Sequence, residues 1–344
     1  MNVRLPRICE KLAIATILFC ALSVSANTEQ ITLRLHTFNS PNAIVVRDFL
    51  IPWAAQIKDI SQDRVTVQIF PAMQLGGRPA DLYGQARDGV VDIIWTVQGY
   101  TPGRFPLTEV FELPFVCGDA EATSVAMMQF YEDWMLDEYS DTHPLVFHAA
   151  APAHLHTVAQ KVTSLNDLKG MKVRTSSQIS AEMLESLGAM PVGMPVPQTY
   201  EALARGVVDA AWLPWTIMRP FRLHEVTKYH TEAGLCCTPF VLTMNKKRYD
   251  ELPSEIQQIL NRTTGIELAK RLGRIWQADE LIGREIAETR GHEILSLSYS
   301  ERARWEDATA TVIQRWITKV TAMGFDGEKL LEDARALVAN YSDG

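Results

Sequence analysis

The chain has 344 residues, of which 47% are hydrophobic and 22% are charged, and this balance excludes a disordered or collagen-like chain. Its 33 basic and 41 acidic residues give a formal net charge of −8, and no basic block occurs, so nucleic acid is not expected as the main partner. The length is typical of two domains and suffices for a large core without metal ions or disulfides.

The segment 1–26 has the three-part pattern of a secretory signal peptide. Basic residues precede an apolar run at 12–22, and the small residues at 24–26 (Val-Ser-Ala) end the segment. The apolar run is shorter than the roughly 20 residues that cross a bilayer as a helix, which favours a cleaved signal peptide over an N-terminal membrane anchor. We therefore expect cleavage after Ala26, a periplasmic mature protein and no direct membrane insertion.

After this segment, predicted strands and helices alternate, which indicates a mainly parallel sheet covered by helices. The strands are alternating or wholly apolar runs, and the helices have apolar residues at helical spacing. The expected elements are a strand at 31–36, a helix at 43–60, a strand at 65–70, a helix at 79–88 and a strand at 90–95.

A second unit further along the chain repeats this rhythm. Gly170, Gly188 and Gly206 each lie where a helix or turn leads into a strand. The expected strands are 154–158, 171–174, 190–192 and 207–212, and the expected helices are 180–187 and 200–205.

The last third of the chain is predicted to be mostly helical. Between Pro253 and Thr289 apolar residues keep a helical spacing and no further proline occurs, which predicts one helix of roughly 35 residues and about 50 Å. Such a helix is longer than one small domain, so it should run along both of the expected domains, or lobes. Two more amphipathic helices are expected at 300–323 and 328–341.

Three cysteines remain after the predicted cleavage, Cys117, Cys236 and Cys237. Adjacent cysteines rarely bond each other, because a disulfide needs Cα atoms about 5.5 Å apart with converging side chains. The sequence leaves open whether all three thiols are free or whether Cys117 pairs with Cys236 or Cys237. No CxxC pair occurs, so no zinc site is expected, and neither is any other metal or a cofactor.

A search for catalytic motifs finds no nucleophile elbow, dinucleotide fingerprint or P-loop. His224 begins a zinc-protease-like pattern, but Lys228 replaces its second histidine. His154 and His156 share one face of a predicted strand; they could begin a metal site, but the polar lining of a cleft is favoured, because no carboxylate or cysteine is close in sequence. His224 and His230 are interpreted as surface or hinge residues.

Four segments resemble the DctP-type solute-binding proteins of tripartite ATP-independent periplasmic (TRAP) transporters. They follow the order of that family and together span most of the mature chain. The segments are 70–77 (Phe-Pro-Ala-Met-Gln-Leu-Gly-Gly), 168–175 (Leu-Lys-Gly-Met-Lys-Val-Arg-Thr), 196–209 (Val-Pro-Gln-Thr-Tyr-Glu-Ala-Leu-Ala-Arg-Gly-Val-Val-Asp) and 244–257, which begins with Met-Asn and contains Leu-Pro-Ser-Glu-Ile-Gln.

The resemblance implies a two-lobed periplasmic-binding-protein fold with mixed, mainly parallel sheets. It implies a receptor that closes on a small organic acid and hands it to the membrane subunits of a TRAP transporter. Lobe I is expected at 27–151 plus 238–279, and lobe II at 152–237 plus 280–344. An exported α/β hydrolase and a ligand sensor for a signalling partner are the alternatives.

Arg174 is the principal candidate for ligand binding. It ends a predicted apolar strand, and ligands of α/β sheets bind beyond the carboxyl ends of strands. Its planar guanidinium can donate two parallel charge-assisted hydrogen bonds to a carboxylate. The carboxylate-binding arginine of the family also falls on this position.

Further candidates follow predicted strands or lie in the loops that resemble the family. The many aromatic side chains favour an aromatic or branched acid over a sugar acid. Thr216 and Ala210 depart from residues that relatives have at these positions, so a relative's ligand does not transfer directly. The further candidates are Phe38, Asn39, Gln74, Trp95, Tyr100, Arg104, His154, Trp212 and Trp215.

Overall fold

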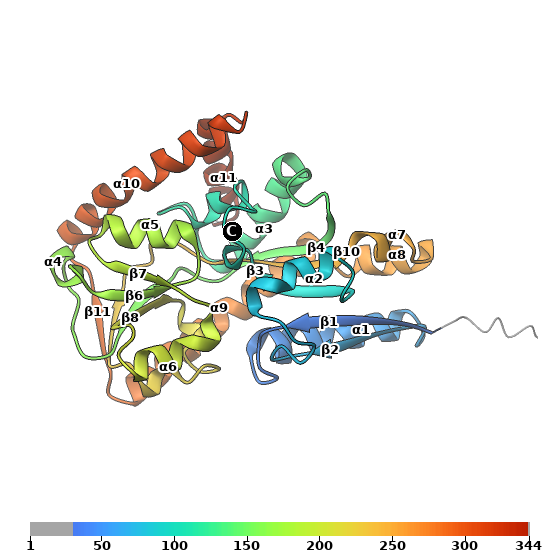
Figure 1. Cartoon of the computed structure of the whole chain (residues 1–344), viewed down its shortest axis with the longest axis horizontal. Helices are drawn as coiled ribbons and strands as arrows, with labels where there is room; N and C mark the ends of the chain where they lie inside the picture. The colour runs from blue at the N-terminus through green and yellow to red at the C-terminus, as the bar shows by residue number, and fades with distance from the viewer. Residues whose placement is uncertain (1–29, 343–344) are drawn as a thin grey trace, which may run out of the picture.

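The computed structural model describes residues 30–342, and the predicted signal peptide lies outside this range. Two sheets with their surrounding helices form two lobes, and α9 (Ile266–Thr289) contacts elements of both (Figure 1). The predicted two-lobed α/β fold is confirmed. Among the described residues, no helix combines the length and the apolar character that a membrane span needs.

The first lobe is built on a five-stranded sheet in the order β2-β1-β3-β10-β4. β1 is parallel to β2 and β3, whereas β10 runs antiparallel to β3 and β4. The strands are β1 (Ile31–Thr37), β2 (Val65–Phe70), β3 (Ile93–Val97), β4 (Thr142–Ala149) and β10 (Pro239–Asn245). The helices of this lobe are α1 (Ile51–Ile60), α2 (Leu82–Arg87), α3 (Ala120–Phe130), α7 (Lys246–Asp250) and α8 (Ser254–Arg262).

The second lobe is built on a six-stranded sheet in the order β11-β9-β5-β8-β6-β7. β6 is parallel to β7 and β8, and β5 is antiparallel to β8 and β9. The strands are β5 (His154–Thr157), β6 (Lys172–Thr175), β7 (Met190–Gly193), β8 (Ala210–Leu213), β9 (Tyr229–Glu232) and β11 (Glu293–Ser296). The helices are α4 (Leu165–Leu168), α5 (Gln178–Ser186), α6 (Thr199–Ala204) and α10 (Tyr299–Ala322).

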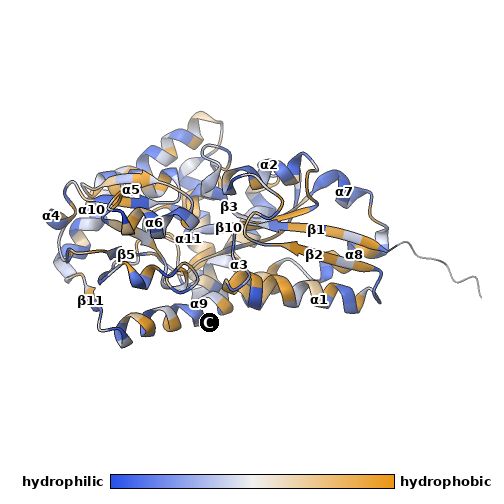
Figure 2. Ribbon diagram, turned by 60° about the horizontal axis from the view of Figure 1, so that its bottom comes forward, coloured by the Kyte–Doolittle hydropathy of each residue, from blue (hydrophilic) through white to orange (hydrophobic). Residues whose placement is uncertain are grey.

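Burial explains why β3 and β10 form the centre of the first lobe. Every residue of both strands is buried, as expected for strands covered on both faces. Figure 2 shows the strands β2 and β10 as largely hydrophobic and α7 as largely hydrophilic. Since the carboxyl ends of β1 and β3 meet the start of β10 at one edge, this edge is a natural place for a ligand.

The prediction of one helix between Pro253 and Thr289 is wrong, because the chain breaks it into α8 and α9. The Thr263 hydroxyl donates to the carbonyls of Ile259 and Leu260, and such side-chain bonds compete with helix continuation. Gly265 has φ +77°, which glycine adopts without strain, and its N–H donates to the carbonyl of Leu145 at 3.0 Å. The 24 residues of α9 still span about 36 Å and contact both lobes.

Besides α9, two extended segments connect the sheets: 150–153 between β4 and β5, and 233–238 between β9 and β10. The segments are hydrogen-bonded to each other, because the Ala153 N–H donates to the Cys236 carbonyl at 2.7 Å and the Ala150 N–H donates to the Thr238 carbonyl at 3.0 Å. The C-terminal helix α11 (Gly327–Ser342) packs on α3, while α10 packs on α5. The exact lobe bounds given above stay a prediction.

The three cysteines are free thiols in this structure. Cys236 and Cys237 are buried, whereas Cys117 is half-buried. The Trp212 indole N–H donates to Cys236 Sγ at 3.3 Å, and Cys237 Sγ donates to the Phe111 carbonyl at 3.2 Å.

Candidate functional site

A pocket with about 400 Å³ of empty volume lies where the two lobes face each other. The first lobe and α9 contribute mainly aromatic and apolar side chains, and the second lobe contributes Arg174 and a proline-containing turn after β8. The lining residues are Phe38, Asn39, Trp95, Val97, Tyr100, Arg174, Ser176, Val196, Leu213, Pro214, Ile217, Thr238, Phe240 and Trp276.

Arg174 lies near the carboxyl end of β6, and only 3% of its surface is exposed. Its Nε and Nη2 atoms donate to the carbonyl of Met194 at 3.0 and 2.8 Å. These two bonds hold the guanidinium plane in place within the second lobe. The other edge of the guanidinium, which includes Nη1, is left to donate to an anion in the pocket.

Tyr100 places a second donor beside this guanidinium. Its hydroxyl oxygen accepts the Val196 N–H at 2.9 Å, so its own proton is left to donate to a ligand. Burial lowers the pKa of Arg174, and the neighbouring Tyr100 opposes this shift. Burial likewise raises the pKa of Tyr100 while Arg174 lowers it, so both groups donate hydrogen bonds at neutral pH. This end of the pocket fits a carboxylate.

Aromatic rings from the first lobe and α9 form a layered wall of the pocket. The Phe240 ring stacks on the Trp95 and Trp276 rings. The ring centroids are 4.7 Å apart in the first pair and 4.9 Å apart in the second, and the interplanar angle is 24° in both pairs. Phe38 tilts against Trp95 at 5.6 Å and against Tyr100 at 5.4 Å. The Trp95 indole N–H donates to His148 Nε2 at 2.9 Å, which fixes the ring. Such a wall suits a flat apolar group.

The structure thus brings Phe38, Asn39, Trp95, Tyr100 and Arg174 together in one pocket. All five were predicted as ligand-binding residues, and they come from three strand ends that are far apart in sequence. The role of each in binding stays a prediction.

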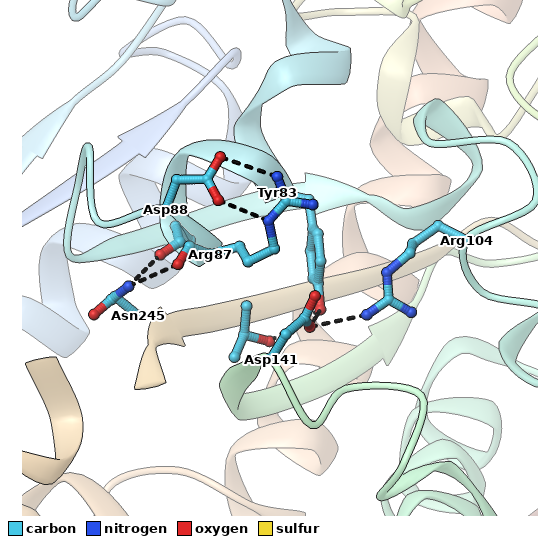
Figure 3. A network of polar contacts seen from close by, with 8 residues as sticks. Tyr83, Arg87, Asp88, Arg104, Asp141 and Asn245 are labelled. Atoms are coloured by element: carbon cyan, nitrogen blue, oxygen red, sulfur yellow. Dashed lines mark hydrogen bonds and ion pairs between the residues drawn. The ribbon is translucent and has the colours of Figure 1, made fainter. Parts of the chain in front are cut away.

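Arg104 and Gln74 are not among the residues that line this pocket. Figure 3 shows Arg104 paired with Asp141, at 2.9 Å between Nη2 and Oδ1, in a network that also includes Tyr83. Its guanidinium also lies 5.1 Å from the centre of the Phe105 ring. Gln74 is exposed to solvent. Arg104 is therefore held by its own lobe.

Trp212, Trp215 and His154 also lie outside the lining of the pocket. Trp212 is buried against Cys236. Trp215 is buried too, and its backbone N–H donates to Glu280 Oε2 at 3.0 Å. The His154 ring lies 6.1 Å from the Trp215 ring, and burial lowers the pKa of His154 to about 4.

Three histidines form a hydrogen-bonded row in the second lobe. His156 Nε2 lies 3.1 Å from the Leu213 carbonyl, which only accepts, so Nε2 carries a proton. Neutral His156 then accepts from His230 at 2.7 Å between Nδ1 atoms, and His230 Nε2 accepts from His292 Nδ1 at 3.0 Å. The interpretation of His224 and His230 as surface residues is wrong, because both are buried.

The family model for bacterial extracellular solute-binding proteins of family 7 (DctP) matches residues 36–319. The chain belongs to this family. DctP proteins are solute receptors rather than enzymes and act outside the cytoplasm.

Several TRAP solute-binding proteins of known structure are similar to this DctP-family chain. One from Rhodoferax ferrireducens T118, in complex with copurified benzoate, is 40% identical, with a TM-score of 0.89 and coverage of 91% of this chain and 99% of that one. One from a marine metagenome, with 3-hydroxybenzoate, is 40% identical, with a TM-score of 0.88 and the same coverage. One from Bordetella bronchiseptica, with both mandelate enantiomers, is 29% identical, with a TM-score of 0.85 and coverage of 90% and 99%.

Two aromatic residues of the DctP-type pocket, Phe240 and Trp276, are not among the sequence candidates. Phe240 lies in a strand that is not among the predicted elements, and Trp276 lies in a helix whose spacing indicates only a buried face. The apolar run Phe-Val-Leu at 240–242, directly after Pro239, is the sequence signal that could have indicated this strand and Phe240. Among residues 30–342, no group of three or more His, Cys, Asp or Glu side chains is arranged to hold a metal ion.

Proposed function

We propose that this protein is the receptor of a TRAP transporter for an aromatic monocarboxylate, which it passes to the membrane subunits. The observation that carries this proposal is the pairing of one buried guanidinium with a wall of stacked rings in a single pocket. The benzoate, 3-hydroxybenzoate and mandelate bound by the relatives are acids of this class.

The charge of the pocket favours one carboxylate over two. Arg174 is the one Lys or Arg side chain among the described residues that line the pocket, and the lining contains no Asp or Glu. A second carboxylate would therefore be buried against aromatic rings without a cation, which is costly. A sugar acid would leave several hydroxyl groups against the same apolar wall.

Hinge closure is the mechanism that fits this geometry. Arg174 is 3% exposed and Tyr100 is 7% exposed, so an acid reaches them only when the lobes separate. A bound acid then contacts Arg174 on the second lobe and the rings on the first lobe, which stabilises the closed arrangement. The paired segments that contain Ala153 and Cys236, together with α9, are the connections about which the lobes would move.

The test is a thermal-shift and calorimetry screen of the mature protein with benzoate, 3-hydroxybenzoate, 3-methylbutanoate, succinate and glucuronate. Benzoate or its hydroxyl derivative should bind best, and at about 100 times Kd it should stabilise the fold by about 2.7 kcal/mol. Binding of succinate or glucuronate without binding of any aromatic acid would refute the proposal.

The two alternatives need separate measurements. An exported hydrolase would turn over aryl esters or amides, and a receptor would leave them unchanged. A signalling sensor would lack membrane subunits, so transport of the bound acid by reconstituted TRAP membrane subunits, dependent on this protein, supports the receptor.

A further inference from the structure

A second, smaller pocket with about 310 Å³ of empty volume lies beside the ligand pocket. Neighbouring residues face the two pockets in turn: Val97 and Phe240 line the ligand pocket, whereas Gln98 and Pro239 line the second pocket. Both lobes contribute to it, because Ser177 at the start of α5 faces the first lobe there. The polar residues that line it include Gln98, Thr108, Glu109, Glu112, Ser177 and Gln178.

Glu112 is the acidic group of this pocket that lacks a basic partner. Glu109, which also lines the pocket, is paired with Lys319 at 2.7 Å. Glu138, which is bonded to Thr108 of the lining, accepts three hydrogen bonds from Leu107 and Thr108. Glu112 is 4% exposed, and among residues 30–342 it forms no ion pair; its carboxyl group faces the Ser177 hydroxyl. A buried carboxylate in such surroundings is costly unless a cation compensates it.

Gln98 is a second, independent sign of a ligand in the same pocket. Its side chain is 3% exposed; its amide N–H faces the Tyr139 hydroxyl, whereas its Oε1 atom has no hydrogen-bond partner within the described part of the chain. Buried amide groups are almost always paired, because an unpaired group gives up its hydrogen bonds to water and gains none in the protein. The free Oε1 atom of Gln98 and the carboxyl group of Glu112 belong to the lining of one cavity.

We propose that this pocket binds a hard cation of the Ca²⁺ type through Glu112, Gln98 and Ser177, with water completing the coordination. All the candidate ligands are oxygen atoms, which Ca²⁺ prefers, and Ca²⁺ tolerates irregular arrangements of carboxylate and neutral oxygen ligands. Burial raises the pKa of Glu112 to about 8, so a proton compensates its charge when the cation is absent.

The position of the site links the cation to lobe closure. Glu112 and Gln98 belong to the first lobe and Ser177 to the second, so all three ligands meet only when the lobes are closed. The cation should therefore raise the affinity for the carboxylate, and the carboxylate should raise the affinity for the cation by the same factor. This coupling rests on the proposed function, whereas cation binding does not.

The first experiment measures the melting temperature of the mature protein without any acid, in CaCl₂ up to about 10 mM and in choline chloride of equal ionic strength. Calcium should raise Tm by at least about 2 °C over choline. Glu112→Gln should abolish the shift and still fold, because glutamine resembles the protonated carboxyl group. The matched control Glu267→Gln removes an exposed carboxylate on α9 and should keep the shift.

Two further measurements decide the assignment. Gln98→Met removes the amide oxygen at similar volume and should weaken the calcium shift. Calcium should also lower the Kd for benzoate at least about 3-fold in the wild type and not in Glu112→Gln. No calcium-specific shift in the wild type, or an equal shift in Glu112→Gln, overturns the proposal. A calcium shift without binding of any aromatic acid counts against the proposed function and supports the cation site.

Discussion

In the proposed function the two lobes contact different parts of the ligand, and the structure shows that they hold their groups in different ways. In the second lobe, Arg174 is oriented by two hydrogen bonds to the Met194 carbonyl of the same lobe. In the first lobe, Trp95 and Phe240 are oriented by stacking within the sheet and with Trp276 of α9. Each half is therefore preorganised before the lobes meet, and little ordering is left for the ligand.

This contrast shows where closure is decided. The Tyr100 hydroxyl of the first lobe accepts the Val196 N–H of the second, so one hydrogen bond crosses between the lobes beside Arg174. A carboxylate at this point adds charged hydrogen bonds, which contribute more than neutral ones. The charged contact between Arg174 and the carboxylate should therefore determine whether an acid binds at all. The contacts with the aromatic rings should determine which acid binds most tightly.

The largest effect is expected from Arg174→Ala. Losing two charge-assisted hydrogen bonds should weaken benzoate binding at least about 100-fold, measured by calorimetry. Arg174→Lys should recover part of the loss, because lysine keeps the charge but not the planar fork. Arg104→Ala is the control: it removes an arginine held by Asp141 and should leave Kd within about 2-fold. Equal losses in both alanine variants would contradict the assigned anchor.

A smaller effect, confined to aromatic ligands, is expected from Phe38→Leu. The variant keeps an apolar side chain but removes ring contacts with Trp95 and Tyr100. Benzoate affinity should fall about 3- to 10-fold, while 3-methylbutanoate affinity should stay nearly constant. A parallel loss for both acids would mean that the wall contributes general apolar burial rather than ring recognition.

The smallest effect is one of pH on stability. Burial lowers the pKa of His154 to about 4 and of His230 to about 3, from 6.5. Their contribution is present above pH 6.5 and is lost as the pH falls toward these values. Burial raises the pKa of Glu112 to about 8 and of Glu138 to about 7, from 4.5. Their contribution is full below pH 4.5 and is lost as the pH rises through 7–8.

The free energy of unfolding should therefore be highest between about pH 4.5 and 6.5, where the two trends oppose each other, and fall on both sides by about 1–3 kcal/mol. Urea unfolding followed by circular dichroism across this range measures it. In Glu112→Gln the free energy of unfolding should decrease less as the pH rises through 7–8, and its decrease at acid pH should be unchanged. Highest stability near pH 8 would contradict the assignment of these shifts.

Local patterns predicted most of the strands and helices and the position of Arg174. Strand alternation and helical spacing depend on neighbouring residues, so 31–36 and 300–323 match β1 and α10 closely. The break at Gly265 was missed, because the apolar spacing continues across it while the two threonines before it end the helix. The strand β10 was missed because it follows the consecutive cysteines in a nearly continuous apolar run without alternation.

Local patterns predicted the α/β class and the strand-end arginine, and the family motifs predicted the two lobes, because each of these signals lies in residues close together in the chain. The stacking of Trp95, Phe240 and Trp276 into one wall depends on the tertiary structure, since the three residues come from a parallel strand, an antiparallel strand and a helix. The tertiary structure likewise decided that Arg104 pairs with Asp141 away from the pocket. Contacts between segments that are distant in sequence depend on how the sheets and α9 pack. The pattern of neighbouring residues in a single sequence does not predict that packing.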